Sequence, residues 1–295
     1  MSADELVDVP LAVPSATPRA GRWPSIDRTT TAAGVVLLVL LVVAVVGPFV
    51  TPVDPNTSDF TRILSGPSPQ HALGTDQLGR DVLARLVYGS RITLIAIAIV
   101  VGVAFALGLL PGLFAGYVGG ATDAVLMRLI DMLISFPPLV LAIAIIGAMG
   151  PGLYHAMPVV GIIQAPYLVR VVRATVLALR RETYIEAART MGGSDLRIVV
   201  RHVLPNIVSV VAVQLTNIAA FAVLAEAGLS FIGLGVVPPQ ASWGSLLKDA
   251  VSYMTIDPML IVYPGLAITV SVLALNLFGD GVLRSMSARR RTIEH

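Results

Sequence analysis

The chain has 295 residues, of which 56% are hydrophobic and 13% are charged, and its mean hydropathy is +0.84. A soluble domain carries about one quarter charged residues, so this composition is typical of an integral membrane protein and excludes an ordinary soluble fold. The absence of cysteine excludes disulfide bonds, thiolate metal sites and a cysteine nucleophile, and 20 basic against 18 acidic residues are too balanced for a nucleic-acid-binding surface.

Six apolar stretches are long enough to cross a membrane as helices. A hydrocarbon core about 30 Å thick requires about 20 residues, because an α-helix rises about 1.5 Å per residue. We expect the spans at residues 31–50, 91–116, 123–148, 157–180, 205–228 and 259–282. The predicted fold class is therefore an all-α integral membrane protein with six transmembrane helices.

Arginine-rich segments determine the predicted orientation of these spans. Residues 1–30, the loop 181–204 with its flanks and the C-terminal tail with its flank carry 12 of the 20 basic residues, and the positive-inside rule places such segments in the cytoplasm. Loops 51–90 and 229–258 then face outward. Residues 1–30 are rich in proline and poor in large apolar residues, so we expect a disordered tail there rather than a secretory signal peptide.

The outward loop 51–90 ends in a segment that is predicted to form an interfacial helix leading into the second span. We expect Asp76 to cap this helix at its N-terminus. The expected apolar side comprises Leu78, Val82, Leu83 and Leu86, and the side expected to face water or lipid headgroups comprises Arg80, Asp81 and Arg85.

Four glycines follow one another at every fourth position from the second span onward: Gly108, Gly112, Gly116 and Gly120. This spacing leaves one helix face without side chains, so another helix can approach it closely. The neighbour is either a helix of the same chain or one of a second subunit.

Several prolines are expected to bend the spans because proline lacks a backbone donor. They lie at positions 111, 137, 138, 166 and 264.

Charged residues within the spans require partners, because an unpaired charge in lipid costs about 2.5–3.5 kcal/mol. Arg128 and Asp131 are three residues apart on one helix face and can pair. Arg170 and Arg173 have the same spacing in the fourth span. We expect Asp131 or Asp280 to neutralise these two arginines and to fix the helix packing; the functional alternative is a positively lined exit.

The fifth span carries polar side chains at helical spacing. Gln214, Asn217 and Phe221 share a face, and Glu226 lies near the outer end. Such a stripe either joins helices to one another or lines a translocation path. No series of acidic and histidine residues runs through the spans as a proton relay would require.

The loop 181–204 predicts two short helices joined by a glycine turn. Thr183 and Glu186 have the spacing of a capping box at the start of the first helix. Gly192 and Gly193 are expected to end that helix, and Ser194 to cap the second one, which runs on toward the fifth span.

Ala187 and Ala188 leave one side of the first short helix nearly bare, so it could insert into a groove of another protein. An ordinary surface helix–turn–helix is the alternative. The sequence Glu186-Ala187-Ala188, with Gly192 and later Leu204-Pro205, resembles the cytoplasmic Glu-Ala-Ala loop of ABC-type importer permeases. The resemblance implies that the loop seats in a cleft of the ATPase subunit. The implied coupling residues are Thr183, Glu186, Ala187, Ala188, Gly192, Leu204 and Pro205.

Two outward segments narrow the resemblance to one branch of that family. Residues 71–91, and residues 226–235 followed by 238–244, are similar to the C-type subunit of dipeptide, oligopeptide and nickel permeases. The outer-face signature residues implied by this similarity are Gly74, Thr75, Asp76, Gly79, Arg80 and Asp81.

This resemblance implies a type I importer permease with residues 91–285 as its core, located in the cell (inner) membrane, that carries di- or oligopeptides. The implied partners are a second permease, ATP-binding subunits, an extracytoplasmic substrate-binding protein and membrane lipid. The chain has no Gly-x-x-x-x-Gly-Lys-Ser/Thr run, so ATP and Mg are expected on the partner ATPase, with no catalytic residue, metal or cofactor here. The alternatives are a nickel or other small-solute permease, or an ATP-independent secondary transporter or channel.

Overall fold

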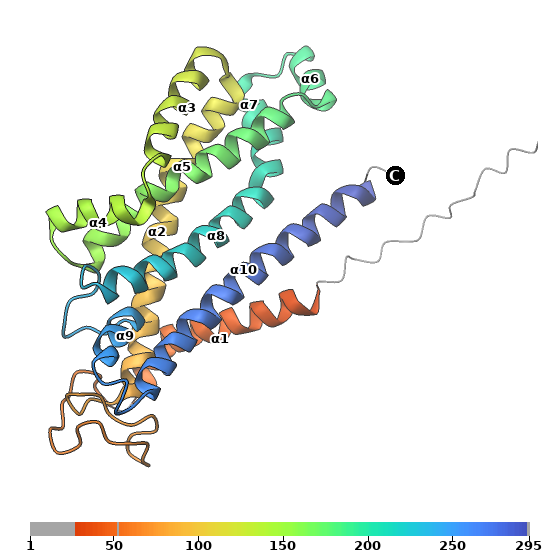
Figure 1. Cartoon of the computed structure of the whole chain (residues 1–295). Helices are drawn as coiled ribbons and strands as arrows, with labels where there is room; N and C mark the ends of the chain where they lie inside the picture. Colours follow the sequence, from red (N-terminus) through yellow and green to blue (C-terminus); the bar gives the residue numbers. More distant parts are fainter. Residues whose placement is uncertain (1–26, 52, 294–295) are drawn as a thin grey trace, which may run out of the picture.

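The computed structural model describes residues 27–51 and 53–293, which form a bundle of long helices (Figure 1). The long helices are α1 (Arg28–Val50), α2 (Val82–Val118), α5 (Leu153–Leu179), α8 (Leu204–Phe231) and α10 (Met259–Ile293). The shorter ones are α3 (Gly120–Ile134), α4 (Pro138–Met149), α6 (Thr183–Thr190), α7 (Asp195–Ile198), the π-helical turn η1 (Val199–Val203) and α9 (Trp243–Val251). Within the described residues the only β pairing is an isolated bridge between Thr75 and Asp81.

In the described part of the chain, five helices are long and apolar enough to cross a membrane, and the α3–α4 pair would make a sixth. The span predicted over 123–148 corresponds to α3 and α4, and the bend expected at Pro137 and Pro138 is confirmed, because the two helices are bent by 79° relative to each other. Two adjacent prolines explain this break. Pro137 has an extended backbone and precedes α4, and Pro138 is the first residue of α4, a position whose N–H has no partner within the helix and can be absent without cost. The other five spans are confirmed as helices, some of them longer than predicted.

Helices α2 and α5 pack closely along the glycine stripe. A Cβ atom on Gly108, Gly112 or Gly116 would lie 2.8, 2.8 or 2.7 Å from the Cβ atoms of Leu168, Val172 and Val176 of α5. Gly161 of α5 fits against Val103 of α2 in the same way. The stripe therefore serves packing within the chain, and Gly120 is not part of it, since no atom lies within 4 Å of its ideal Cβ position.

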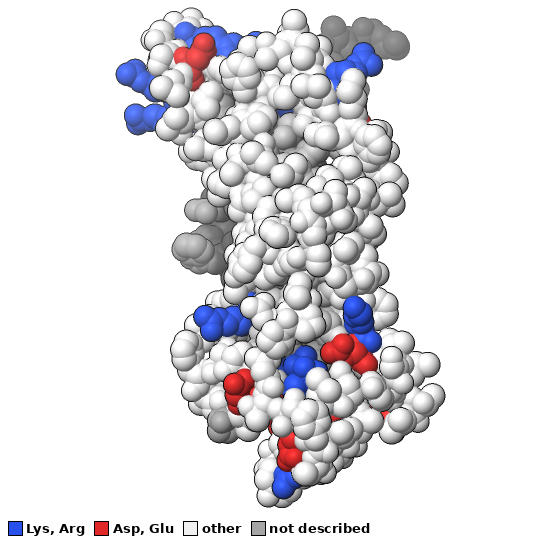
Figure 2. All heavy atoms as spheres, turned by 90° about the vertical axis from the view of Figure 1, so that its left-hand side faces the viewer, with Lys and Arg blue, Asp and Glu red and all other residues white. Residues whose placement is uncertain are grey.

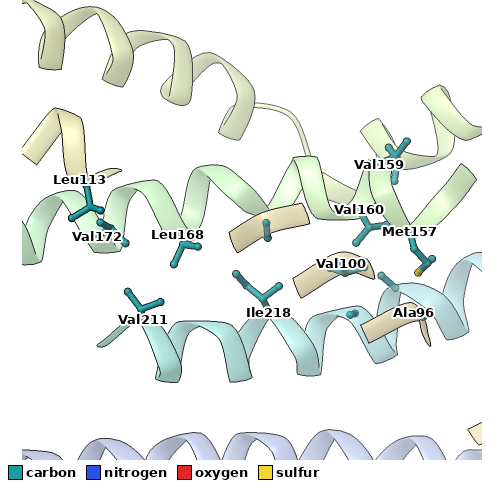
Figure 3. Close-up of a cluster of buried hydrophobic side chains, with 14 of the residues drawn as sticks. Ala96, Val100, Leu113, Met157, Val159, Val160, Leu168, Val172, Val211 and Ile218 are labelled. Carbon is teal, nitrogen blue, oxygen red and sulfur yellow. The ribbon is translucent and has the colours of Figure 1, made fainter. Parts of the chain in front are cut away.

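The core continues from this contact to α8 (Figure 3). Leu168 and Val172 of α5 lie between α2 and α8, and Val211 and Ile218 of α8 close the cluster from the other side. Each of these side chains is buried. Three helices thus form the rigid centre of the subunit.

Replacing Gly112 with Ala is expected to destabilise the subunit by about 1–3 kcal/mol, because the added methyl group overpacks the α2–α5 contact. Gly102 on the same helix is the matched control, since nothing lies within 4 Å of its Cβ position. Thermal unfolding in detergent should show a lower midpoint than the wild type for Gly112→Ala and no decrease in midpoint for Gly102→Ala. Equal midpoints for the two variants would contradict the packing assigned to the stripe.

Helix α1 lies against α10, which brings the two ends of the described chain together. Thr30 packs against Gly281, and Arg284 Nη2 lies 3.9 Å from Asp27 Oδ2. The predicted tail 1–30 lies outside the described residues except for 27–30, where α1 has already begun at Arg28. The predicted tail 286–295 is helical as far as Ile293.

The distribution of charge agrees with a membrane-embedded bundle. On the face drawn in Figure 2, charged side chains gather at the two ends, and the broad band between them is uncharged. The α6–α7 segment lies at one end of the bundle and α9 at the other (Figure 1). Apolar side chains on the outside of the helices are exposed, for example Leu38 and Val39 of α1, as expected where lipid is the solvent.

Candidate functional site

The candidate site is the elbow, which we define as residues 183–203, comprising α6, α7 and η1. Its first helix begins at Thr183 after Glu182, which has an extended backbone and makes no capping hydrogen bond. The predicted capping box of Thr183 and Glu186 is therefore wrong. Because Glu182 occupies the N-cap position, Thr183 is already helical and cannot cap the helix that contains it.

The glycine turn of the elbow is confirmed and forms a Schellman motif. Gly192 has φ +80°, and its N–H donates to the Arg189 carbonyl at 3.0 Å. The Gly193 N–H donates to the Ala188 carbonyl at 3.0 Å, so the Ala188 and Arg189 carbonyls in the last turn of α6 are satisfied. A Cβ on Gly193 would lie 2.8 Å from that same carbonyl oxygen. Two consecutive glycines are thus required for two different reasons.

The second arm of the elbow runs without a break into α8. Ser194 is at the N-cap position as predicted, although its side chain makes no capping bond. The helix passes through η1 into α8 at Leu204, and Pro205 lies in the first turn of α8. Leu204 packs against the main core, so this predicted coupling residue serves mainly to anchor the second arm.

Apolar side chains hold the elbow on the bundle. Ile185 of α6 and Ile198 of α7 are fully buried members of the main core. Ala188 packs against the same core, whereas Ala187 and Glu186 are exposed. The expectation that both alanines leave one open face is therefore wrong. Consecutive helical residues point about 100° apart, so only Ala187 remains free for a partner.

Two exposed apolar side chains at the turn were not singled out by the sequence reasoning. Met191 is 82% exposed and Leu196 is 75% exposed, on either side of the glycine turn. We call these two residues the apolar tip. The sequence signal for them is large apolar residues within a few positions of a glycine pair in a charged loop. Exposed apolar side chains that lie together mark interaction sites.

A second group of predicted residues builds the α9 lobe, defined as residues 53–81 together with α9. Asp81, and not Asp76, is the N-cap of α2, because its carboxylate accepts the Ala84 N–H at 2.7 Å. The same carboxylate lies 2.9 Å from His71 Nδ1. The interfacial helix expected from Asp76 onward therefore begins only at Val82. Gly79, with φ +72°, prevents an earlier start.

Buried charges lie at the centre of the α9 lobe, contrary to the expectation that they face water or headgroups. Asp76 Oδ2 accepts from Arg80 Nε at 2.7 Å and lies 3.4 Å from Arg85 Nε. Asp249 of α9 lies 3.8 and 3.9 Å from the two guanidinium groups. Arg85 is only 2% exposed, and Arg80, Asp76 and Asp81 are also buried. The desolvation cost of each buried charge is offset by the opposite charges next to it.

The remaining signature residues shape the loop around these charges. Gly74 has φ +79°, and a Cβ there would lie 2.5 Å from the Ser65 carbonyl oxygen. The Thr75 hydroxyl donates to the Arg62 carbonyl and accepts from the Ser65 N–H at 3.0 Å. The six signature residues thus have a structural role in the lobe.

Charge pairs join α3 to α5. Arg170 Nη2 donates to Asp131 Oδ1 at 2.5 Å, and Arg173 Nη2 donates to Asp123 Oδ2 at 2.6 Å. The prediction that Asp131 or Asp280 neutralises these arginines is confirmed for Asp131, which pairs with Arg170, and among the described residues the predicted pair of Arg128 with Asp131 is not formed. The sequence reasoning did not single out Asp123, which lies 50 positions from Arg173 and is brought to it by the packing of α3 against α5.

The polar residues of α8 separate into two groups. Gln214 and Phe221 are half-buried and Asn217 is exposed. Glu226 is fully buried, and its Oε1 accepts from Ser230 Oγ at 2.7 Å, so it does not line a path. It lies beside Ala227, whose carbonyl oxygen would be 2.4 Å from a Cβ on Gly244 of α9. Glu226 therefore belongs to the contact between α8 and the α9 lobe.

Within the described residues, no three His, Asp or Glu side chains come together as metal ligands would. What the arrangement does provide is mechanical: an exposed apolar tip on an anchored elbow, continuous with a membrane-crossing helix that reaches the α9 lobe.

Comparisons with known proteins show which family the chain is similar to. Residues 108–292 match the family described as binding-protein-dependent transport system inner membrane component, and residues 27–67 match the N-terminal transmembrane domain of oligopeptide transport permease C. The glutathione transport system permease protein GsiD of Pectobacterium atrosepticum is 40% identical over 267 residues, covering 90% of this chain and 89% of the relative. A putative peptide transport system permease protein of Brucella suis is 40% identical over 260 residues, covering 88% and 87%.

A solved structure, that of the MetNI methionine ABC transporter in inward-facing conformations, has the same fold. It matches with a TM-score of 0.58 at 21% identity and covers 68% of this chain and 96% of that chain. The family resemblance predicted from the Glu-Ala-Ala loop is therefore confirmed. The chain belongs to the binding-protein-dependent transport system inner membrane components, the multi-pass permease subunits of ABC importers.

Proposed function

We propose that this subunit forms half of the translocation path of an ATP-driven importer of di- and oligopeptides, glutathione among them. The relatives named above are peptide and glutathione transport permeases, which supports this cargo class. A second homologous permease supplies the other half of the path. Gln214, Asn217 and Phe221 of α8 are the side chains proposed to line it.

The apolar tip is the observation that carries the proposal. Met191 and Leu196 are among the most exposed large apolar residues of the structure, and they stand on an elbow whose inner side is fully anchored. Because the chain has no phosphate-binding loop of its own, nucleotide must act on it through a separate subunit. An exposed apolar knob on a short helix is the shape that fits a groove in such a subunit.

The proposed mechanism assigns different partners to the two ends of the bundle, the ATPase to the elbow and the substrate-binding protein to the α9 lobe. Closure of an ATPase dimer displaces the elbow, because the ATPase makes different contacts with it in its two nucleotide states. The elbow and both chain termini then lie in the cytoplasm. The α9 lobe faces outward at the opposite end (Figure 1), where it receives the substrate-binding protein.

The direct test is uptake by the complex that co-purifies with this subunit, reconstituted in lipid vesicles with its binding protein. Radiolabelled dialanine and glutathione should accumulate with ATP and not with a non-hydrolysable analogue. Accumulation without nucleotide would support the secondary transporter or channel instead. Uptake of Ni²⁺ but neither peptide would overturn the cargo assignment.

Replacing Leu196 with Glu should weaken association with the ATPase at least tenfold, because a charge then enters an apolar contact that excludes water. Leu196→Met is the matched control, since it keeps the volume and apolar character of the tip. Co-purification of the ATPase with each variant measures the effect. If Leu196→Glu retains the ATPase as fully as Leu196→Met does, the apolar tip is not the contact surface.

A further inference from the structure

Tyr117, near the end of α2, contacts both arms of the elbow. Its hydroxyl donates to Asp195 Oδ1 of α7 at 2.6 Å and accepts from Arg189 Nη2 of α6 at 3.4 Å. The Arg189 guanidinium also lies over the Tyr117 ring, 5.7 Å from its centroid. One side chain of a membrane-crossing helix thus joins the last turn of one arm to the first residue of the other.

The apolar packing that holds the inner side of the elbow on the bundle lacks this directionality. Ile185 and Ile198 are held by apolar packing, which is non-directional and allows neighbouring side chains to slide. A hydrogen bond weakens steeply when its angle or length changes, and one to a charged acceptor is stronger than a neutral one. The hydrogen bond to Tyr117 also raises the pKa of the Arg189 guanidinium above its ordinary value, so this partner stays charged.

The residues around Tyr117 connect it to further helices. Two residues beyond it, Gly119 separates α2 from α3, and both Gly119 and Gly120, the first residue of α3, have positive φ angles, +72° and +64°. Arg180, at the end of α5, donates from Nη1 to the Val118 carbonyl at 3.3 Å. Tyr117 therefore lies at a junction of α2, α3, α5 and the elbow.

Helix α3 has room to respond at this junction. An apolar groove of about 970 Å³ separates it from α2, and its lining includes Phe114, Tyr117, Val125 and Leu129. Only Ile130 of α3 is buried. The helix is otherwise held to α5 by the pairs of Asp123 and Asp131 with the two arginines.

We propose that Tyr117 is a positioning residue that conveys displacement of the elbow to α2 and, across the Gly119–Gly120 joint, to α3. This inference rests on the proposed function, because it assigns the route by which force from the ATPase enters the membrane-crossing helices. Tyr117 itself touches neither ATP nor cargo. Its role is to keep the two arms of the elbow and the end of α2 moving together.

The test is the number of peptides transported per ATP hydrolysed by the reconstituted complex. Tyr117→Phe keeps the ring and removes the hydroxyl, and it should lower this ratio about tenfold while the ATPase still co-purifies. Tyr154→Phe is the matched control, because that side chain is 66% exposed at the far end of α5. Asp195→Asn keeps an acceptor oxygen and should restore most of the coupling that Asp195→Ala loses.

A double variant separates this role from a merely structural one. If Tyr117 and Asp195 act through one hydrogen bond, Tyr117→Phe combined with Asp195→Ala should be no worse than either alone. Additive losses, or a wild-type ratio in Tyr117→Phe, would overturn the inference. Should Tyr117→Phe fail to assemble, Asp195→Ala removes the same bond from an exposed position and is judged by the same ratio. A wild-type complex that takes up peptide without hydrolysing ATP would instead refute the proposed function.

Discussion

Replacing Gly192 with Val is expected to abolish ATP-coupled uptake while leaving membrane insertion intact. Gly192 has φ +80°, a conformation that costs an L residue about 1–2 kcal/mol and is most unfavourable for a β-branched side chain. No atom lies within 4 Å of the ideal Cβ position, so the effect arises from the backbone and not from a steric clash. The turn would open, and the apolar tip would no longer be presented to the ATPase. Peptide uptake by vesicles containing the reconstituted complex measures the loss.

The matched control at this position is Gly192→Asn. Asparagine adopts the left-handed conformation at much lower cost than valine, so the Schellman motif should persist and most uptake should remain. Both variants should be recovered from the membrane in wild-type amounts, because Gly192 is exposed and no atom lies within 4 Å of its Cβ position. Unchanged transport by Gly192→Val would refute the role of the turn in coupling.

Replacing Asp76 with Ala is expected to destabilise the subunit by about 3–5 kcal/mol, the cost of leaving buried charges without their partner. Arg80 and Arg85 would then face each other with only the more distant Asp249 to neutralise them. The carboxylate also accepts the backbone N–H groups of Leu78 and Arg80 at 2.8 and 3.0 Å, so the loop itself would lose its fold. The yield of monodisperse protein and its thermal unfolding in detergent measure the effect.

Asp249→Ala tests the same network from its exposed side. The Asp249 side chain is 37% exposed, and its contacts are 3.8 and 3.9 Å long, so its removal should cost about 1 kcal/mol or less. Asp76→Asn, which keeps the acceptor for the backbone bonds, should fall between the two. If Asp76→Ala and Asp249→Ala unfold at the same temperature, Asp76 is not the centre of the lobe.

Hydropathy predicts the existence of the long helices because lipid offers no hydrogen-bond partners. A spanning segment must therefore satisfy its backbone N–H and C=O groups within its own helix, whatever its neighbours are. It does not predict the 79° bend between α3 and α4. Adjacent prolines signal a bend, but its angle depends on how α4 packs against α5. The glycine spacing correctly predicts a close helix contact, whereas the choice of α5 as the neighbour follows only from the folded chain.

The site was predictable where local chemistry decides it. The turn at Gly192 and the cap position of Ser194 follow from short-range backbone preferences. The capping box failed by a single residue, since Glu182 takes the extended conformation that Thr183 would have needed. The burial of Arg80 and Arg85 was not predictable, because charged residues at an interface are ordinarily solvated and only the folded loop reveals their partners.

The continuity of α7, η1 and α8 has a mechanical consequence for the whole subunit. These elements form one apolar rod of 37 residues from Asp195 to Phe231, about 55 Å long at 1.5 Å per residue. Its far end carries Glu226 and Ser230, which hold it to the segment leading to α9. Because a helix resists compression along its axis, displacement of the elbow in the proposed mechanism would move the far end of α8 directly, in addition to the displacement that Tyr117 conveys to α2. Access to the translocation path from the two sides of the membrane would then change together.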